Sequence, residues 1–126
     1  MVQQTFTDME YANRKRTTRR EAFLQAMESI IPWNEWMALI APFYVQKERG
    51  RKLISLETML RMYLLQNWFG LSDEGVEDAI YDSYAMNHFL RIDFSTEQTP
   101  DATILLHFQH LLEKHDITRK IFDDVK

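Results

Sequence analysis

Four stretches of this chain repeat apolar residues at helical spacing, and each begins beside a residue suited to cap a helix. In the first stretch, Thr18 and Glu21 have the spacing of a capping box. In the central stretch, Ser55 precedes the apolar stripe and Gly70 stands where a helix should end. Only three Gly and three Pro occur, which disfavours a fold dense in turns. The pattern therefore predicts an all-α fold.

The spacing predicts a compact bundle of about six helices, of which four are expected near 18–31, 55–69, 72–82 and 100–114. A further short helix is expected at 83–91, and the pieces 55–69, 72–82 and 83–91 have the lengths of a helix-turn-helix-like unit with a supporting helix. Ahead of the later helix, Thr99 is expected as the cap, with Pro100 and Asp101 in the first turn. Asp116 is expected to cap a last helix.

The domain organisation follows from the same periodicity. Residues 1–16 are polar and basic without a helical repeat, so they are expected to form a flexible arm. Residues 17–126 are expected to form one helical domain, because 126 residues with 45% hydrophobic side chains suit a single core.

Charge is unevenly distributed along the chain. The net charge of −4 argues against a nucleic-acid binder, but residues 1–20 carry +3 and residues 47–61 carry +3, whereas residues 73–126 carry −7. This split predicts a basic side that faces the phosphates of duplex DNA and an acidic side that faces away. The candidate phosphate contacts are Arg14, Lys15, Arg16, Arg19, Arg20, Lys47, Arg49, Arg51 and Lys52.

Each basic cluster could equally be a solvated surface when taken alone, so a second kind of candidate matters. Polar side chains on the short helix at 83–91 are candidates for contacts in a DNA groove. They are Asn87, His88 and Arg91.

The sequence lacks the motifs that would indicate several classes of chemistry. Without cysteine there is no disulfide, thiolate metal site or Cys nucleophile, which fits a reducing cytoplasm. His107 and His110 lie on neighbouring turns, but without a recognised metal spacing and beside residues committed to packing. The acids Asp73, Glu77 and Asp78 fit a solvated helix face. We therefore expect no catalytic residue, metal site or small-molecule substrate, and no secretory signal or membrane span.

The order of motifs resembles the InsH-like bacterial insertion-sequence transposases over nearly the whole chain. The resemblance rests on Arg19-Arg20-Glu21, Ile31-Pro32-Trp33, Pro42-Phe43-Tyr44, Gly50-Arg51, Leu56 to Arg61, Leu71-Ser72-Asp73, Glu77-Asp78-Ala79, Pro100-Asp101 and His110 to Glu113. Two departures are Leu53-Ile54-Ser55, where the family often has Pro-Tyr-Pro, and Gln109, where it commonly has Arg.

The resemblance implies the N-terminal DNA-binding and assembly domain of a bacterial cytoplasmic transposase, which recognises element ends in double-stranded DNA. It places the RNase H-like catalytic domain and its divalent metal after this region, so no cofactor is expected in this chain. Self-association or pairing with full-length transposase is also expected, because tryptophans cluster in the chain and because Ile121, Phe122 and Val125 suggest an uncovered apolar face. The alternative is a truncated or repurposed fragment that acts as a protein-interaction module or inhibits a nucleic-acid enzyme.

Overall fold

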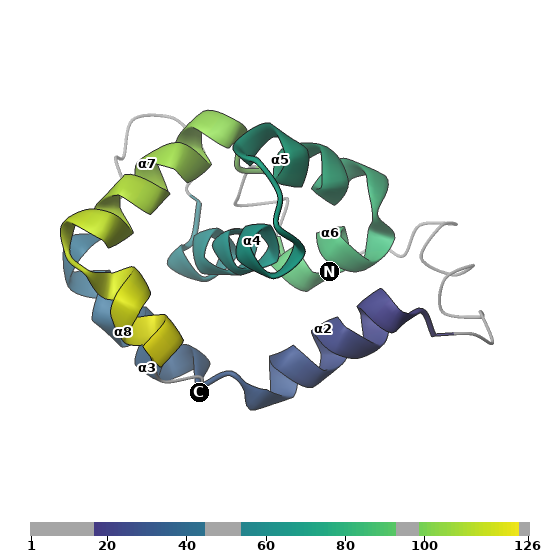
Figure 1. Cartoon of the computed structure of the whole chain (residues 1–126), viewed down its shortest axis with the longest axis horizontal. Coiled ribbons are helices and arrows are strands. Elements are labelled where there is room, and N and C mark those ends of the chain that lie inside the picture. The colour runs from purple at the N-terminus through teal and green to yellow at the C-terminus, as the bar shows by residue number, and fades with distance from the viewer. Residues whose placement is uncertain (1–16, 45–53, 93–98, 124–126) are drawn as a thin grey trace. The chain divides into compact units, whose positions relative to one another are not determined.

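The structure, a computed structural model, describes residues 17–44, 54–92 and 99–123. Within those residues every regular element is a helix and none is a strand, which confirms the predicted all-α class. The chain divides into two compact units, one ending at Ile31 and the other beginning at Pro32. The first unit contributes α2 (Arg19–Ile30). The second holds α3 (Trp33–Ile40), the 3₁₀ helix η1 (Ala41–Phe43), α4 (Leu56–Phe69), α5 (Asp73–Asp82), α6 (Tyr84–Leu90), α7 (Ala102–Lys114) and α8 (Ile117–Asp123) (Figure 1).

Local capping chemistry sets most of the helix ends. Thr18 and Glu21 form the predicted capping box, with the Glu21 amide donating to Thr18 Oγ1 at 3.1 Å. Ser55 and Ser72 cap α4 and α5 as expected. Gly70 ends α4 in the left-handed conformation, at φ 61°. The predicted bounds of these helices are therefore confirmed to within one or two residues.

The expected cap of α7 is wrong. The cap of α7 is Asp101, whose carboxylate accepts from the Ile104 amide at 2.8 Å, so Thr99 and Pro100 lie before the helix. A carboxylate is at least as good an N-cap as a hydroxyl, which explains why the start moves by two residues. Asp116, the expected cap of the last helix, lies directly before α8 in a left-handed conformation, at φ 55°, and its capping role stays a prediction.

The second unit is built around α4. Eight consecutive residues of this helix, Thr58 to Leu65, are buried, as expected for a helix covered on all sides. It contacts α3, α5, α6 and α7, and it runs through the middle of the unit in Figure 1. The positions of the flanking helices therefore depend on side chains from α4.

Helices α5 and α7 run antiparallel. Asp73, at the start of α5, accepts from Gln109 near the end of α7. One turn later Glu77 Oε1 accepts from the Ala102 amide at 2.8 Å, in the first turn of α7. Glu77 thus satisfies one of the amides that a helix start leaves without an intrahelical acceptor.

The apolar side of α8 is covered by its own unit. Ile117 and Ile121 are buried, and the ring of Phe122 lies 6.4 Å from that of Tyr63. The side chain of Val125 lies outside the described residues. The apolar face inferred from the sequence is therefore not open at these positions, and the expectation of self-association loses that argument.

Candidate nucleic-acid interface

Two of the three predicted groove residues, Asn87 and His88, lie on α6, and the third, Arg91, is the C-cap residue that follows it in the left-handed conformation, at φ 54°. Ser83 caps this helix by accepting from the Met86 amide at 3.3 Å. Met86, Phe89 and Leu90 are buried, so packing fixes one side of the helix. On the other side His88 and Arg91 are exposed and Asn87 is half-buried. An amide and an imidazole on α6 and a guanidinium just after its end are therefore at least partly accessible to solvent.

A buried arginine from α4 holds the end of α6. Arg61 Nη1 donates to the backbone carbonyl oxygen of Phe89 at 3.0 Å, and Arg61 Nε pairs with Glu57 at 3.2 Å. Its guanidinium carbon lies 4.1 Å from the ring centroid of Trp33 and 4.9 Å from that of Phe89. A cation at a helix C-terminus and over aromatic faces is favourable, so Arg61 links α3, α4 and α6.

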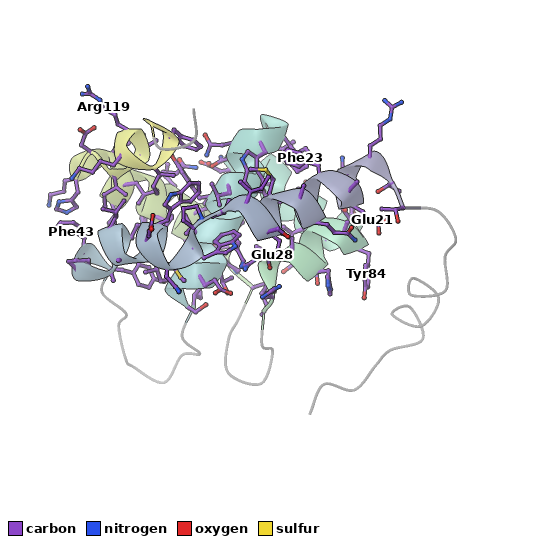
Figure 2. All side chains as sticks on the ribbon, turned by 90° about the horizontal axis from the view of Figure 1, so that it is seen from below. Glu21, Phe23, Glu28, Phe43, Tyr84 and Arg119 are labelled. Atoms are coloured by element: carbon purple, nitrogen blue, oxygen red, sulfur yellow. The ribbon has the colours of Figure 1, made fainter. Side chains whose placement is uncertain are left out.

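The aromatic side chains near α6 are used in packing. The Phe89 ring lies 6.0 Å from Trp33 and 5.7 Å from Trp68, in tilted or edge-on geometry. On the surface of α6 the rings of Tyr84 and His88 stack at 5.9 Å with an interplanar angle of 11°. Figure 2 shows Tyr84 at the start of this helix. The cluster gives α6 a rigid base and leaves its polar side at the surface.

The helix before α6 has a surface that disfavours DNA. Glu74, Asp78 and Asp82 recur every four residues along α5, and all three are exposed. A three-residue turn joins α4 to α5, and carboxylates along the second of these helices would repel phosphates. Helix α6 carries no carboxylate, so this repulsion does not apply to it.

The remaining predicted cations divide between two groups. Arg19 and Arg20 are exposed in the first turn of α2, in the unit that ends at Ile31. The others lie outside the described residues: Arg14, Lys15, Arg16, Lys47, Arg49, Arg51 and Lys52. Tyr44 and Ile54 are the described residues on either side of 45–53, the stretch that contains Lys47, Arg49, Arg51 and Lys52. They are joined by a hydrogen bond, in which the Tyr44 hydroxyl donates to the Ile54 carbonyl at 2.6 Å. Tyr44 also packs edge-on against Phe108 of α7.

Sequence reasoning missed Arg61 and three exposed cations. An arginine inside the apolar run of α4, four residues after Glu57, was the available signal for Arg61. Lys114, Arg119 and Lys120 are exposed on α7 and α8, and Figure 2 shows Arg119 extending outward. Their charge is partly offset by Glu113 and Asp116, so their spacing alone gave no clear basic segment.

Other chemistries find little support in the part of the chain that the structure describes. No group of three metal-ligating side chains comes together within residues 17–44, 54–92 and 99–123. His107 and His110 are exposed on α7. None of the described helices is long and apolar enough to cross a membrane.

No solved structure matches this chain. The model of a family described as Transposase domain (DUF772) matches residues 12–111. The match includes α2 through α6 and most of α7, and so contains the described residues of the candidate interface. Since it covers most of the sequence, the chain belongs to the Transposase domain (DUF772) family, whose name points to a role in transposition.

Proposed function

We propose that this chain is the DNA-binding and assembly module of an insertion-sequence transposase. It recognises the ends of the element in duplex DNA and carries out no bond chemistry itself. The observation that carries this proposal is the accessibility of Asn87 and His88 on α6 and of Arg91 at its C-cap, within a transposase-family domain. The divalent metal of strand transfer belongs, in this proposal, to another part of the transposase.

The chemistry of these side chains suits base reading. An amide such as that of Asn87 can pair with two atoms of an adenine edge, and a guanidinium such as that of Arg91 can pair with guanine. Because Arg61 and the Trp33, Trp68 and Phe89 rings hold α6 against α3 and α4, the helix enters a groove without first being ordered.

Phosphate contacts supply the sequence-independent part of the affinity. Arg19 and Arg20, with the cations of 14–16 and 47–52, neutralise phosphates and release counterions. The acidic surface of α5 turns away from the duplex, since it would otherwise meet phosphates of the same charge. This arrangement accounts for binding by a protein whose net charge is −4.

Selection from a pool of random duplexes tests the proposal and yields the sequence that the chain prefers. The selected and a scrambled duplex are then titrated with the full chain by fluorescence anisotropy at several salt concentrations. We expect a slope of log K against log salt of about −3 to −6, since several of the nine cations stay solvated. We also expect at least about tenfold tighter binding to the selected duplex. An absence of salt-dependent binding to either duplex would overturn the proposal.

The proposal that the chain itself carries out no bond chemistry needs a separate test. The purified chain is incubated with the selected duplex and either Mg²⁺ or Mn²⁺, and the DNA is resolved on a denaturing gel. Intact DNA is the expected result, and cleavage or joining that depends on the metal would contradict it.

A further inference from the structure

An open groove of about 350 Å³ lies between the C-terminal half of α4 and α7. It lies within the second unit and shares no residue with the candidate interface on α6. The side chains that matter for its chemistry are Tyr63, Gln66, Asn67, Leu71, Gln109 and Glu113.

Asp73 fixes the orientation of two amides beside this groove. Gln66 Nε2 donates to Asp73 Oδ1 at 2.7 Å, and Gln109 Nε2 donates to the same oxygen at 2.8 Å. Gln109 Nε2 also donates to Gln66 Oε1. A carboxylate only accepts, so both amide nitrogens must turn toward Asp73. Among the described residues no donor meets Gln109 Oε1, which remains an unused acceptor.

Asn67 and Glu113 add further acceptors. Asn67 Nδ2 donates to the Tyr63 carbonyl at 2.8 Å, and a carbonyl can only accept, so Asn67 Oδ1 is the amide atom left for a ligand. Within the described part of the chain, no ion pair engages the exposed carboxylate of Glu113. Three neighbouring side chains therefore offer unused oxygens in one groove.

The electrostatics of the groove favour a cation over a phosphate. It lies at the C-terminal end of α4, where the dipole of a 14-residue helix adds partial negative charge. The carboxylates of Asp73 and Glu113 have the same sign. DNA is therefore not the ligand that this groove suits, and a donor-rich cation is.

An arginine side chain matches both the polar and the apolar parts of the groove. Its planar guanidinium carries five N–H donors in a fixed fork, which can reach several acceptors at once. Its aliphatic stem can lie along Tyr63 and Leu71, which also line the groove. A lysine offers a point charge and is a poorer match to spread acceptors.

We propose that the groove between α4 and α7 binds an arginine from the Arg14-Lys15-Arg16 stretch of a second copy of this chain. Charge complementarity supports the pairing, because that stretch is cationic and the groove is rich in acceptors. The choice of a second copy rests on the proposed function, in which copies must assemble on DNA. One arginine fills the groove, which leaves the other cations of the stretch for phosphates.

Binding of the stretch is tested with a peptide of residues 11–20 added to the full, ¹⁵N-labelled chain. The side-chain amide signals of Gln66, Asn67 and Gln109 should shift, and a peptide with lysine at positions 14 and 16 should shift them less. E113Q should weaken peptide binding about two- to fivefold, as expected for an exposed charge pair. The matched control D78N removes the same charge from the exposed side of α5 and should leave binding unchanged. Equal effects of E113Q and D78N, or no shift at all, would overturn the proposal.

The origin of the arginine is tested by sedimentation. The wild-type chain should self-associate, while an N67A/E113Q groove variant and an R14Q/R16Q variant should each associate more weakly. A mixture of the two variants should recover part of the association, because it restores one intact contact per pair. If the wild-type chain is monomeric while the peptide still shifts the groove signals, the assignment to a second copy is wrong.

DNA binding separates this proposal from the proposed function. The groove variant should bind a selected duplex as the wild-type monomer does, because no groove residue lies on α2 or α6. A wild-type chain that binds the peptide but no duplex would remove the proposed function and leave the arginine groove standing.

Discussion

The guanidinium of Arg61 donates a hydrogen bond to the backbone carbonyl oxygen of Phe89 at 3.0 Å, from a side chain that is only 2% exposed. The two residues are 28 positions apart. The bond satisfies a carbonyl at the C-terminal end of α6, where the helix leaves its last carbonyls without intrahelical donors. It also gives the buried cation a hydrogen-bond partner besides Glu57, so the central helix and α6 are stabilised together.

Replacement of Arg61 by methionine should lower the free energy of unfolding by about 1.5 to 3 kcal/mol, because a charged hydrogen bond is lost and the Phe89 carbonyl loses its donor. Urea unfolding followed by circular dichroism measures this change. The control E57Q keeps an acceptor near Arg61 Nε at a partly exposed position, and should cost less than about 1 kcal/mol. Equal stability of R61M and the wild type would show that this bond contributes little.

Much of the helical framework could be predicted because its signals are local. Ser72 and Ser83 cap their helices through amides three residues away, and Gly70 ends α4 by its own backbone conformation. The error at α7 is also local. Both Thr99 and Asp101 suit an N-cap, and the sequence pattern alone does not decide between them.

The contacts that shape the site could not be predicted, because they join residues far apart in the chain. Nothing near Gln109 indicates that its amide meets Asp73, 36 positions earlier. The polar residues of this segment could be predicted, since Asn87 and His88 alternate with the apolar Met86, Phe89 and Leu90, and Arg91 follows them. The contacts by which Arg61 stabilises α6 depend on how α3, α4 and α6 pack together. The helical repeat of the sequence carries no information about that packing.

The corrected cap of α7 gives a paired prediction. Asp101→Ala removes the acceptor of the Ile104 amide and should lower the free energy of unfolding by about 1 kcal/mol. Thr99→Ala should change it by less than about 0.5 kcal/mol, since Thr99 lies before the cap. Thermal or urea unfolding of both variants decides the matter. If Thr99→Ala lowered the free energy of unfolding more than Asp101→Ala, Thr99 and not Asp101 would be the cap.

The acidic surface of α5 should be dispensable for DNA binding. Neutralisation of Glu74, Asp78 and Asp82 to Gln, Asn and Asn removes three exposed negative charges, so affinity for any duplex should rise modestly at low salt. The preference for a selected duplex should stay the same, because these residues face away from it in the proposed arrangement. Anisotropy titrations of the selected and scrambled duplexes measure both quantities. A change in preference would indicate that α5, rather than α6, reads the groove.

Substitutions on α2 should affect phosphate contacts, whereas substitutions on α6 should affect base recognition. Arg19→Ala and Arg20→Ala together should weaken binding to every duplex and flatten the salt slope by about 2, near the loss of two phosphate contacts. Alanine favours helix, so α2 should remain folded. Asn87→Ala should leave the salt slope unchanged and reduce discrimination between selected and scrambled duplexes by about 1 to 3 kcal/mol. Both variants are measured by anisotropy over the same salt series. If Asn87→Ala weakened binding to both duplexes equally, α6 would contact the DNA backbone and sequence recognition would have to lie elsewhere in the chain.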